Sequence, residues 1–166
     1  MSRVNAPVIQ AADAKTLNSL HKALDSVARE RRWLALAEAP PLAAVVAFAD
    51  ILARQGCPQL VALDGKRVVG WCDIRVHEGA LSRHVGVLGM GVVDGYRGRG
   101  IGRALLEACL AKSPFARVEL SVFADNTAAI KLYEKTGFVH EGVRRRAIRL
   151  EGDRDLVLMA RLVEGP

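Results

Sequence analysis

The sequence lacks the features that mark several large classes of protein. Aromatic residues make up only 5% of its 166 residues, and its most apolar tract, residues 42–53, is interrupted by Asp50. Because a helix needs about 20 apolar residues to span a bilayer, this tract is too short, and we expect no membrane partner. The first residues, MSRVNAPVIQAADAK, hold no continuous apolar segment, which argues against a secretory signal peptide.

Cysteine is scarce as well. Cys57, Cys72 and Cys109 are odd in number, lack the short spacing of metal ligands and lie in apolar surroundings. We expect reduced core cysteines, a cytoplasmic protein and no metal. The chain shows no internal repeat or low-complexity tract, and its length suits a single domain over residues 1–166.

The excess of positive charge is modest. Lysine and arginine number 24 against 18 acidic residues, which gives a net charge of +6. The arginines are dispersed, and no basic surface with interleaved aromatics accompanies them, so we expect no nucleic-acid partner. The same excess suits a polyanionic cofactor equally well.

What the sequence does contain is a glycine-rich stretch, LGMGVVDGYRGRGIGRALL, over residues 88–106. An apolar run rich in β-formers stops at the turn signal Asp94-Gly95, and glycines and arginines alternate behind it. Apolar residues at helical spacing follow, namely Ile101, Leu105 and Cys109. The pattern predicts a strand, a glycine loop and a helix that opens at the loop. Such a loop aims free N–H groups and the helix dipole at one point, which favours a phosphate or pyrophosphate ligand.

Two common nucleotide motifs do not fit this loop. Gly100 is followed by Ile101 rather than by Lys and Ser or Thr, which excludes a P-loop. The third glycine of a dinucleotide fingerprint is also missing, because Leu105 stands where it is required after Gly102. The pattern that does fit is R-x-x-G-x-G, from Arg97 to Gly102, which resembles the acyl-CoA pyrophosphate loop of the GNAT superfamily of N-acetyltransferases.

Hydrophobic periodicity and turn signals predict the order β α α β β β α β α β β. Short links favour three consecutive antiparallel strands before the glycine loop, and the strand–helix–strand unit around the loop favours a parallel crossover. The expected elements are residues 8–11, 17–28, 42–52, 59–63, 68–76, 84–93, 101–110, 117–123, 126–135, 138–146 and 153–162. We expect Asp13 to cap the first helix, the pair Asp125-Asn126 to cap the last one and Gly137 to end it.

A second stretch, ELSVFADNTAAIKLYEKTGFVHEG over residues 119–142, is similar to the second signature region of GNAT enzymes. The matching positions are Asn126, Ala129, Leu132-Tyr133 and Gly137-Phe138. With the glycine loop, the resemblance covers about residues 68–162. It implies an α+β fold, a single-domain GNAT fold with a mostly antiparallel twisted sheet, a parallel crossover at the acyl-CoA site and helices on both faces.

The resemblance also implies acetyl-CoA as co-substrate and a direct attack by an amine in a ternary complex. The cofactor is then expected between the strand ending near Val93 and the strand beginning near Arg117, with Tyr133 as the acid that protonates the departing thiolate. The implied cofactor-binding residues are Met90, Gly91, Val92, Val93, Arg97, Gly98, Arg99, Gly100, Ile101, Gly102, Arg103, Asn126 and Tyr133. A catalytically silent acyl-CoA sensor on the same fold is the alternative.

The sequence leaves the base and the acceptor open. Asp73, Glu78, His84, Glu119 or an ordered water are the alternatives for the base. An α-amino group has a pKa near 7.7–8.0 and is neutral far more often at pH 7.5 than a lysine amine, so a small-molecule or peptide α-amine is the expected acceptor. Residues 30–33 and 77–83 are expected to line the acceptor site. The sequence does not decide whether the protein forms a homodimer.

Overall fold

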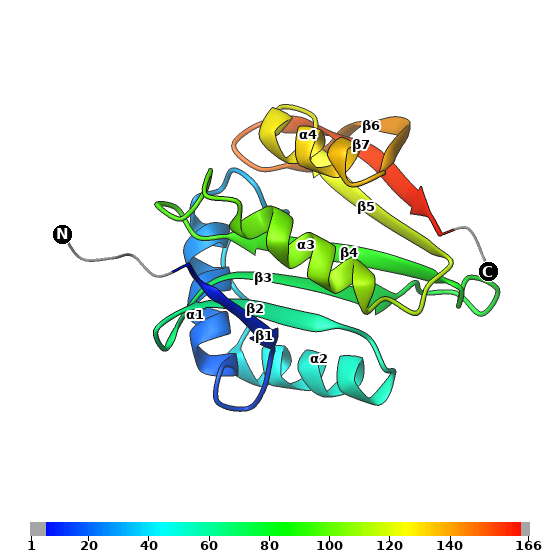
Figure 1. The fold of residues 1–166 in the computed structure, drawn as a ribbon. Coiled ribbons are helices and arrows are strands. Elements are labelled where there is room, and N and C mark those ends of the chain that lie inside the picture. The colour runs from blue at the N-terminus through cyan, green and yellow to red at the C-terminus, as the bar shows by residue number, and fades with distance from the viewer. Residues whose placement is uncertain (1–5, 164–166) are drawn as a thin grey trace.

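A computed structural model describes residues 6–163 of the chain (Figure 1). These residues form seven strands and four helices, in the order that the sequence predicts. Their bounds are β1 Val8–Ala11, α1 Leu17–Arg29, α2 Leu42–Arg54, β2 Gln59–Asp64, β3 Arg67–Val76, β4 Val85–Val92, α3 Ile101–Ala111, β5 Arg117–Phe123, α4 Thr127–Lys135, β6 Val139–Arg149 and β7 Asp153–Leu162. None of the helices in this range is long and apolar enough to cross a membrane.

The strands form one sheet in the order β1-β2-β3-β4-β5-β7-β6. Five of the neighbouring pairs are antiparallel, whereas β4 and β5 run parallel, as the strand–helix–strand pattern predicts. The parallel pairing joins only Val85–Val87 to Arg117–Glu119. Figure 1 shows β4 and β5 side by side at one end and well apart at the other. The sheet is therefore open between its two central strands.

Helices cover both faces of this sheet. On one face, α3 packs its apolar row, Ile101, Leu105 and Cys109, against Cys72 and Ile74 of β3. On the other face, α1 packs Leu20, Ala23 and Val27 against Trp71. The mixed α+β fold expected from the sequence is confirmed. The three cysteines are buried and form no disulfide, also as predicted.

The helix ends explain where the chain turns. Asn126 accepts a hydrogen bond from Ala129 N at 3.2 Å and caps α4 as predicted, and Gly137, with φ +91°, ends it in the left-handed conformation that favours glycine. Asp13 also caps the start of the first helix as predicted. Its carboxylate accepts from the backbone N–H groups of Lys15 and Thr16, and its own N–H donates to Thr16 Oγ1, in the first turn that leads into α1 at Leu17.

Close packing around Gly86 in β4 leaves no room for a side chain at this position. A Cβ there would lie 2.5 Å from Ile74 and 2.5 Å from the Phe115 ring. We expect Gly86→Ala to destabilise the fold by about 1–3 kcal/mol, the usual cost of overpacking a core. Chemical denaturation measures this, with Gly142→Ala as the matched control, because a Cβ at that strand glycine meets nothing within 4 Å. Equal stability of the two variants would contradict the packing described.

Candidate active site

A cavity of about 550 Å³ occupies the opening between β4 and β5. One wall comes from residues 88–92 of β4 and the other from residues 120–123 of β5. Since the pairing of these strands ends at Val87 and Glu119, the β4 edge along the cavity has no β5 ladder partner. The cavity also reaches Val27 of α1 and Tyr133 of α4, so it passes from one side of the sheet to the other. An extended ligand can therefore lie along the β4 edge as an added strand does.

The glycine loop forms one end of the cavity. Gly98 and Gly100 adopt φ +71° and +79°, which L side chains rarely tolerate, and a Cβ at either position would meet no protein atom within 4 Å. α3 begins at Ile101, directly after Gly100, so its first backbone N–H groups point out of the helix towards the loop. Open space, free N–H groups and the positive helix end together make a cradle that fits a pyrophosphate.

Arg97 lines the cavity, but its guanidinium is already engaged within the protein. It donates to both carboxylate oxygens of Glu30 at 2.8 and 2.6 Å, and its Nε donates to Val92 O at 2.8 Å. Glu30 follows the last residue of α1, so this pair joins α1 to the start of the glycine loop. The geometry indicates that Arg97 fixes the position of the loop, and Glu30 already balances its charge.

The other cofactor-binding residues expected from the sequence divide into two groups. Met90, Gly91, Val92, Gly98, Gly100, Gly102, Arg103, Asn126 and Tyr133 line the cavity together with Arg97. Val93 and Ile101 are instead buried in the core, and Arg99 lies with its guanidinium 5.3 Å from the centre of the Tyr96 ring. These three residues could therefore contact a cofactor only through their backbone groups, which lie just after β4 and around the start of α3.

Tyr133 of α4 lines the cavity. It is 7% exposed, its ring packs on Phe138 at 5.7 Å, and its hydroxyl makes no hydrogen bond with another residue between 6 and 163. Burial raises the pKa of this phenol well above 10. The hydroxyl is thus a proton donor that stays protonated at neutral pH. Asn126, whose side chain caps α4, lies at the same wall.

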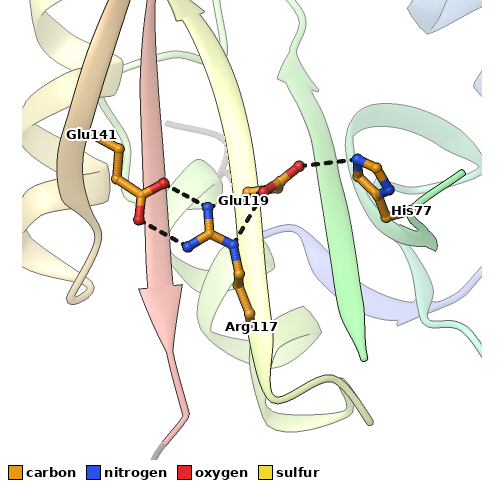
Figure 2. Close-up of polar contacts among 4 residues, drawn as sticks. All are labelled: His77, Arg117, Glu119 and Glu141. Atoms are coloured by element: carbon orange, nitrogen blue, oxygen red, sulfur yellow. Dashed lines mark hydrogen bonds and ion pairs between the residues drawn. The ribbon is translucent and has the colours of Figure 1, made fainter. Parts of the chain in front are cut away.

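Two of the four possible bases lie on strands of the sheet. Asp73 of β3 is buried, and the loss of water around it raises its pKa to about 7, although Arg75 opposes the shift. One carboxylate oxygen of Glu119 in β5 accepts a hydrogen bond from Arg117, which also donates to Glu141. The other oxygen of Glu119 lies 3.6 Å from His77 Nε2 (Figure 2). Glu78 and His84 lie in the β3–β4 loop, and neither lines the cavity.

The acceptor side is only partly as expected. Trp33, from the expected wall 30–33, lines the cavity with its neighbours Leu34 and Ala35. The other expected wall, loop 77–83, contributes no lining residue, and that prediction is wrong. The loop precedes Val85, where β4 and β5 are still paired, so it lies at the closed end of the strands.

Several cavity residues were missed in the sequence, chiefly those of β5 and of the α1–α2 segment. The resemblance to GNAT enzymes did place the cofactor beside the strand that begins near Arg117, and alternation along RVELSVF could have named Leu120 and Val122. No signal in the sequence points to Leu34 or Ala35. Among residues 6–163, no group of three or more metal-ligating side chains lies together.

The pairing of Arg97 with Glu30 leads to a first test of this site. Both side chains are less than a third exposed and the contact is bidentate, so a double-mutant cycle with Glu30→Ala and Arg97→Ala should give a coupling of about 1 kcal/mol in unfolding. The exposed pair of Arg103 and Glu107 on α3 is the control and should show coupling near zero. Additive effects of the Glu30 and Arg97 variants would exclude the bond.

Asp73 leads to a second test. A folded-state pKa near 7, above the ordinary 3.8, means that the folded protein keeps a proton that the unfolded chain loses, so stability falls as pH rises from about 4 to 7. Asp73→Asn removes this cost. The stability of this variant relative to the wild type, followed by its melting temperature, should therefore rise between pH 5 and pH 8, by at most about 3 kcal/mol. A difference in melting temperature between the two proteins that stays the same across this pH range would show that the pKa of Asp73 is not raised.

Comparison with known proteins agrees with this geometry. Residues 21–138 match the profile of the Acetyltransferase (GNAT) family. The chain is 37% identical over 114 residues to the L-amino acid N-acetyltransferase AaaT of Escherichia coli, which covers 66% of this chain and 70% of that protein. It is 46% identical over 63 residues to the N-alpha-acetyltransferase RimI of Mycobacterium tuberculosis, and this alignment covers 38% of this chain and 40% of RimI.

The fold has close counterparts among solved structures. One is yncA, described as a putative acetyltransferase from Salmonella typhimurium with its cofactor acetyl-CoA, which superposes with a TM-score of 0.90 at 18% identity and covers 98% of this chain and 96% of the other. Similarity at that level of identity shows the fold alone. The family profile spans most of the chain, including the glycine loop and Tyr133, so the protein belongs to the GNAT family of acetyltransferases.

Proposed function

We propose that the protein, as one catalytic domain over residues 1–166, transfers the acetyl group of acetyl-CoA to the α-amino group of an amino acid or peptide. The observation that carries this proposal is the cavity between β4 and β5, which joins the glycine loop to an opening beside α1. A donor and an acceptor can then meet from opposite sides of the sheet, which suits direct attack in a ternary complex. An α-amine is supported by the similarity to AaaT, an L-amino acid N-acetyltransferase, and to RimI, an N-alpha-acetyltransferase.

The chain's own residues fit acetyl-CoA along the length of this cavity. The glycine cradle at α3 would hold the pyrophosphate, and the free edge of β4 from Met90 to Val92 would pair with the pantetheine arm. Asn126 at the N-terminus of α4 would add a polar contact. When bound, acetyl-CoA supplies a thioester carbonyl, and a backbone N–H of the β4 edge would polarise it as an oxyanion hole does.

Tyr133 is the proposed proton donor to the departing thiolate. Its hydroxyl is protonated at neutral pH because burial raises its pKa, and no described residue competes for its proton through a hydrogen bond. A thiol has an ordinary pKa near 8.5, so its thiolate accepts a proton readily once the donor is in reach. The surrounding apolar wall, which includes Leu120 and Leu132, keeps bulk water away from this step.

A thiol-release assay with acetyl-CoA tests the proposed function. The panel comprises free amino acids, short peptides, N-formylated copies of the same peptides, polyamines and aminoglycosides. We expect turnover with free α-amines and none with their N-formylated copies, which differ only at the attacking nitrogen. Turnover confined to lysine side chains, polyamines or aminoglycosides would overturn the choice of acceptor.

Tyr133→Phe tests the role of the hydroxyl. The ring still packs on Phe138, so the fold and the affinity for acetyl-CoA should be kept, while kcat falls by about 10²–10⁴-fold, the usual range for a lost general acid. Calorimetry with acetyl-CoA and steady-state kinetics measure the two quantities separately. Wild-type kcat in this variant would leave Tyr133 as a packing residue.

A further inference from the structure

Asp73 is a buried carboxyl group without a partner. It lies on β3 directly across from Gly89 of β4, and it is 8% exposed. Among residues 6–163, no hydrogen bond to its carboxylate is formed, and its oxygens are not fully enclosed, so a donor can still reach them. A buried carboxylate is normally paired or hydrogen-bonded, because its removal from water is costly. An unpaired one therefore indicates that a donor arrives from outside the protein.

The carboxyl group lies directly behind a part of the cavity wall that has no side chain, namely Gly89. Gly89 lines the cavity, and its Cβ position lies 3.5 and 3.9 Å from the two carboxylate oxygens of Asp73. Two residues earlier on β3, Trp71 fills the space beside Gly91 and packs against α1. Since residues two apart on a strand share a face, Asp73 faces the α1 side of the sheet, as Val27 of the cavity wall does.

We infer that Asp73 binds the ammonium group of the acceptor and takes the proton that this group must lose before it attacks the thioester. The inference rests on the proposed function, and it assigns a base that the sequence left open among four side chains and water. The cavity is lined by Trp33 and Val27 as well as by Gly89, so an acceptor that enters beside α1 would bring its amine to the face where the Asp73 carboxyl lies.

The proton and electron balance is as follows. The ammonium R–NH₃⁺ gives one proton to the Asp73 carboxylate, and the lone pair of R–NH₂ forms the new bond to the carbonyl carbon. The C–S bond breaks, its electron pair stays on sulfur, and the thiolate takes the Tyr133 proton. The nitrogen, now positive, loses its second proton and thereby restores the Tyr133 hydroxyl, directly or through water. Asp73 releases its proton to solvent, so the products are amide, thiol and one H⁺.

The surroundings of Asp73 match an α-amine. Arg75 on the same strand is the charged group that acts on it, the thiols of Cys57 and Cys72 are its titratable neighbours, and the facing residues Gln59 and Gly89 carry no charge. Burial raises its pKa to about 7, close to the 7.7–8.0 of an α-amino group. Transfer from a lysine ammonium, with a pKa near 10.4, would be uphill by roughly three pKa units.

Glu119 is the competing carboxylate on the same face. Its oxygens contact Arg117 and approach His77, and Arg117 is held in turn by Glu141 (Figure 2). The Glu119 carboxylate is therefore already engaged by partners within the protein, whereas that of Asp73 is not. Glu119→Gln is therefore the matched control: it also replaces a strand carboxylate by an amide, one position beyond the cavity-lining residue Leu120.

The experiment compares kcat against pH for the wild type, Asp73→Asn and Glu119→Gln. The acceptor is the amine of the panel that gives the highest turnover, at saturating concentration. The wild type should show an ascending limb with a midpoint near pH 7. Asp73→Asn should lose that limb and about 10²–10⁴-fold in kcat at pH 7.5, with partial recovery at high pH, where the amine is neutral on its own. Calorimetry should show unchanged acetyl-CoA affinity in all three proteins.

The outcomes separate the two proposals. An ascending limb whose midpoint stays near pH 7 with full kcat in Asp73→Asn, or that disappears in Glu119→Gln instead, overturns the role of Asp73 while the proposed function stands. Turnover of amines other than α-amines overturns the proposed acceptor, yet the same three profiles, recorded with that other amine, still decide on Asp73. Absence of turnover with every amine overturns both.

Discussion

The structure depends on one interruption of a hydrogen-bond ladder. β4 and β5 pair in parallel over three residues each and then separate, because the chain leaves β4 through the glycine loop and returns through α3 to the closed end of the pair. The backbone groups that the ladder no longer uses face a cavity. A sheet with full β4–β5 pairing would have the same core but no place for an extended cofactor. The strand separation is thus the feature from which binding and catalysis both follow.

Polar contacts between distant segments hold the two sides of this opening. At the glycine loop, Arg97 joins the loop to Glu30 at the end of α1. Beyond it, Arg31 pairs with Glu151 at the β6–β7 turn, and Arg154 of β7 donates to Arg32 O. The α1–α2 segment, which carries Trp33, is therefore attached both to the cofactor side and to the hairpin.

The sequence predicts the parts of the site that are encoded locally. The glycine loop, the cap at Asn126 and the end of α4 at Gly137 depend on backbone conformation and spacing within a few residues, so a single sequence shows them. The partner of Arg97 could not be foreseen, since Glu30 lies 67 residues away and only packing brings the two together. For the same reason the loop 77–83 was misplaced: its distance from the cavity follows from the register of β4 with β5, which the sequence does not encode in any one segment.

The central claim is that the glycine loop holds the pyrophosphate of acetyl-CoA, and two glycine variants test it most directly. Gly95 and Gly100 have φ +83° and +79°, and a Cβ at either position meets no protein atom within 4 Å, so alanine strains the backbone equally at both. Only Gly100 lines the cavity. Calorimetric titration with acetyl-CoA should show an affinity at least about tenfold lower for Gly100→Ala, a loss of about 1.4 kcal/mol, and near wild-type affinity for Gly95→Ala. Equal affinities of the two variants would contradict the account.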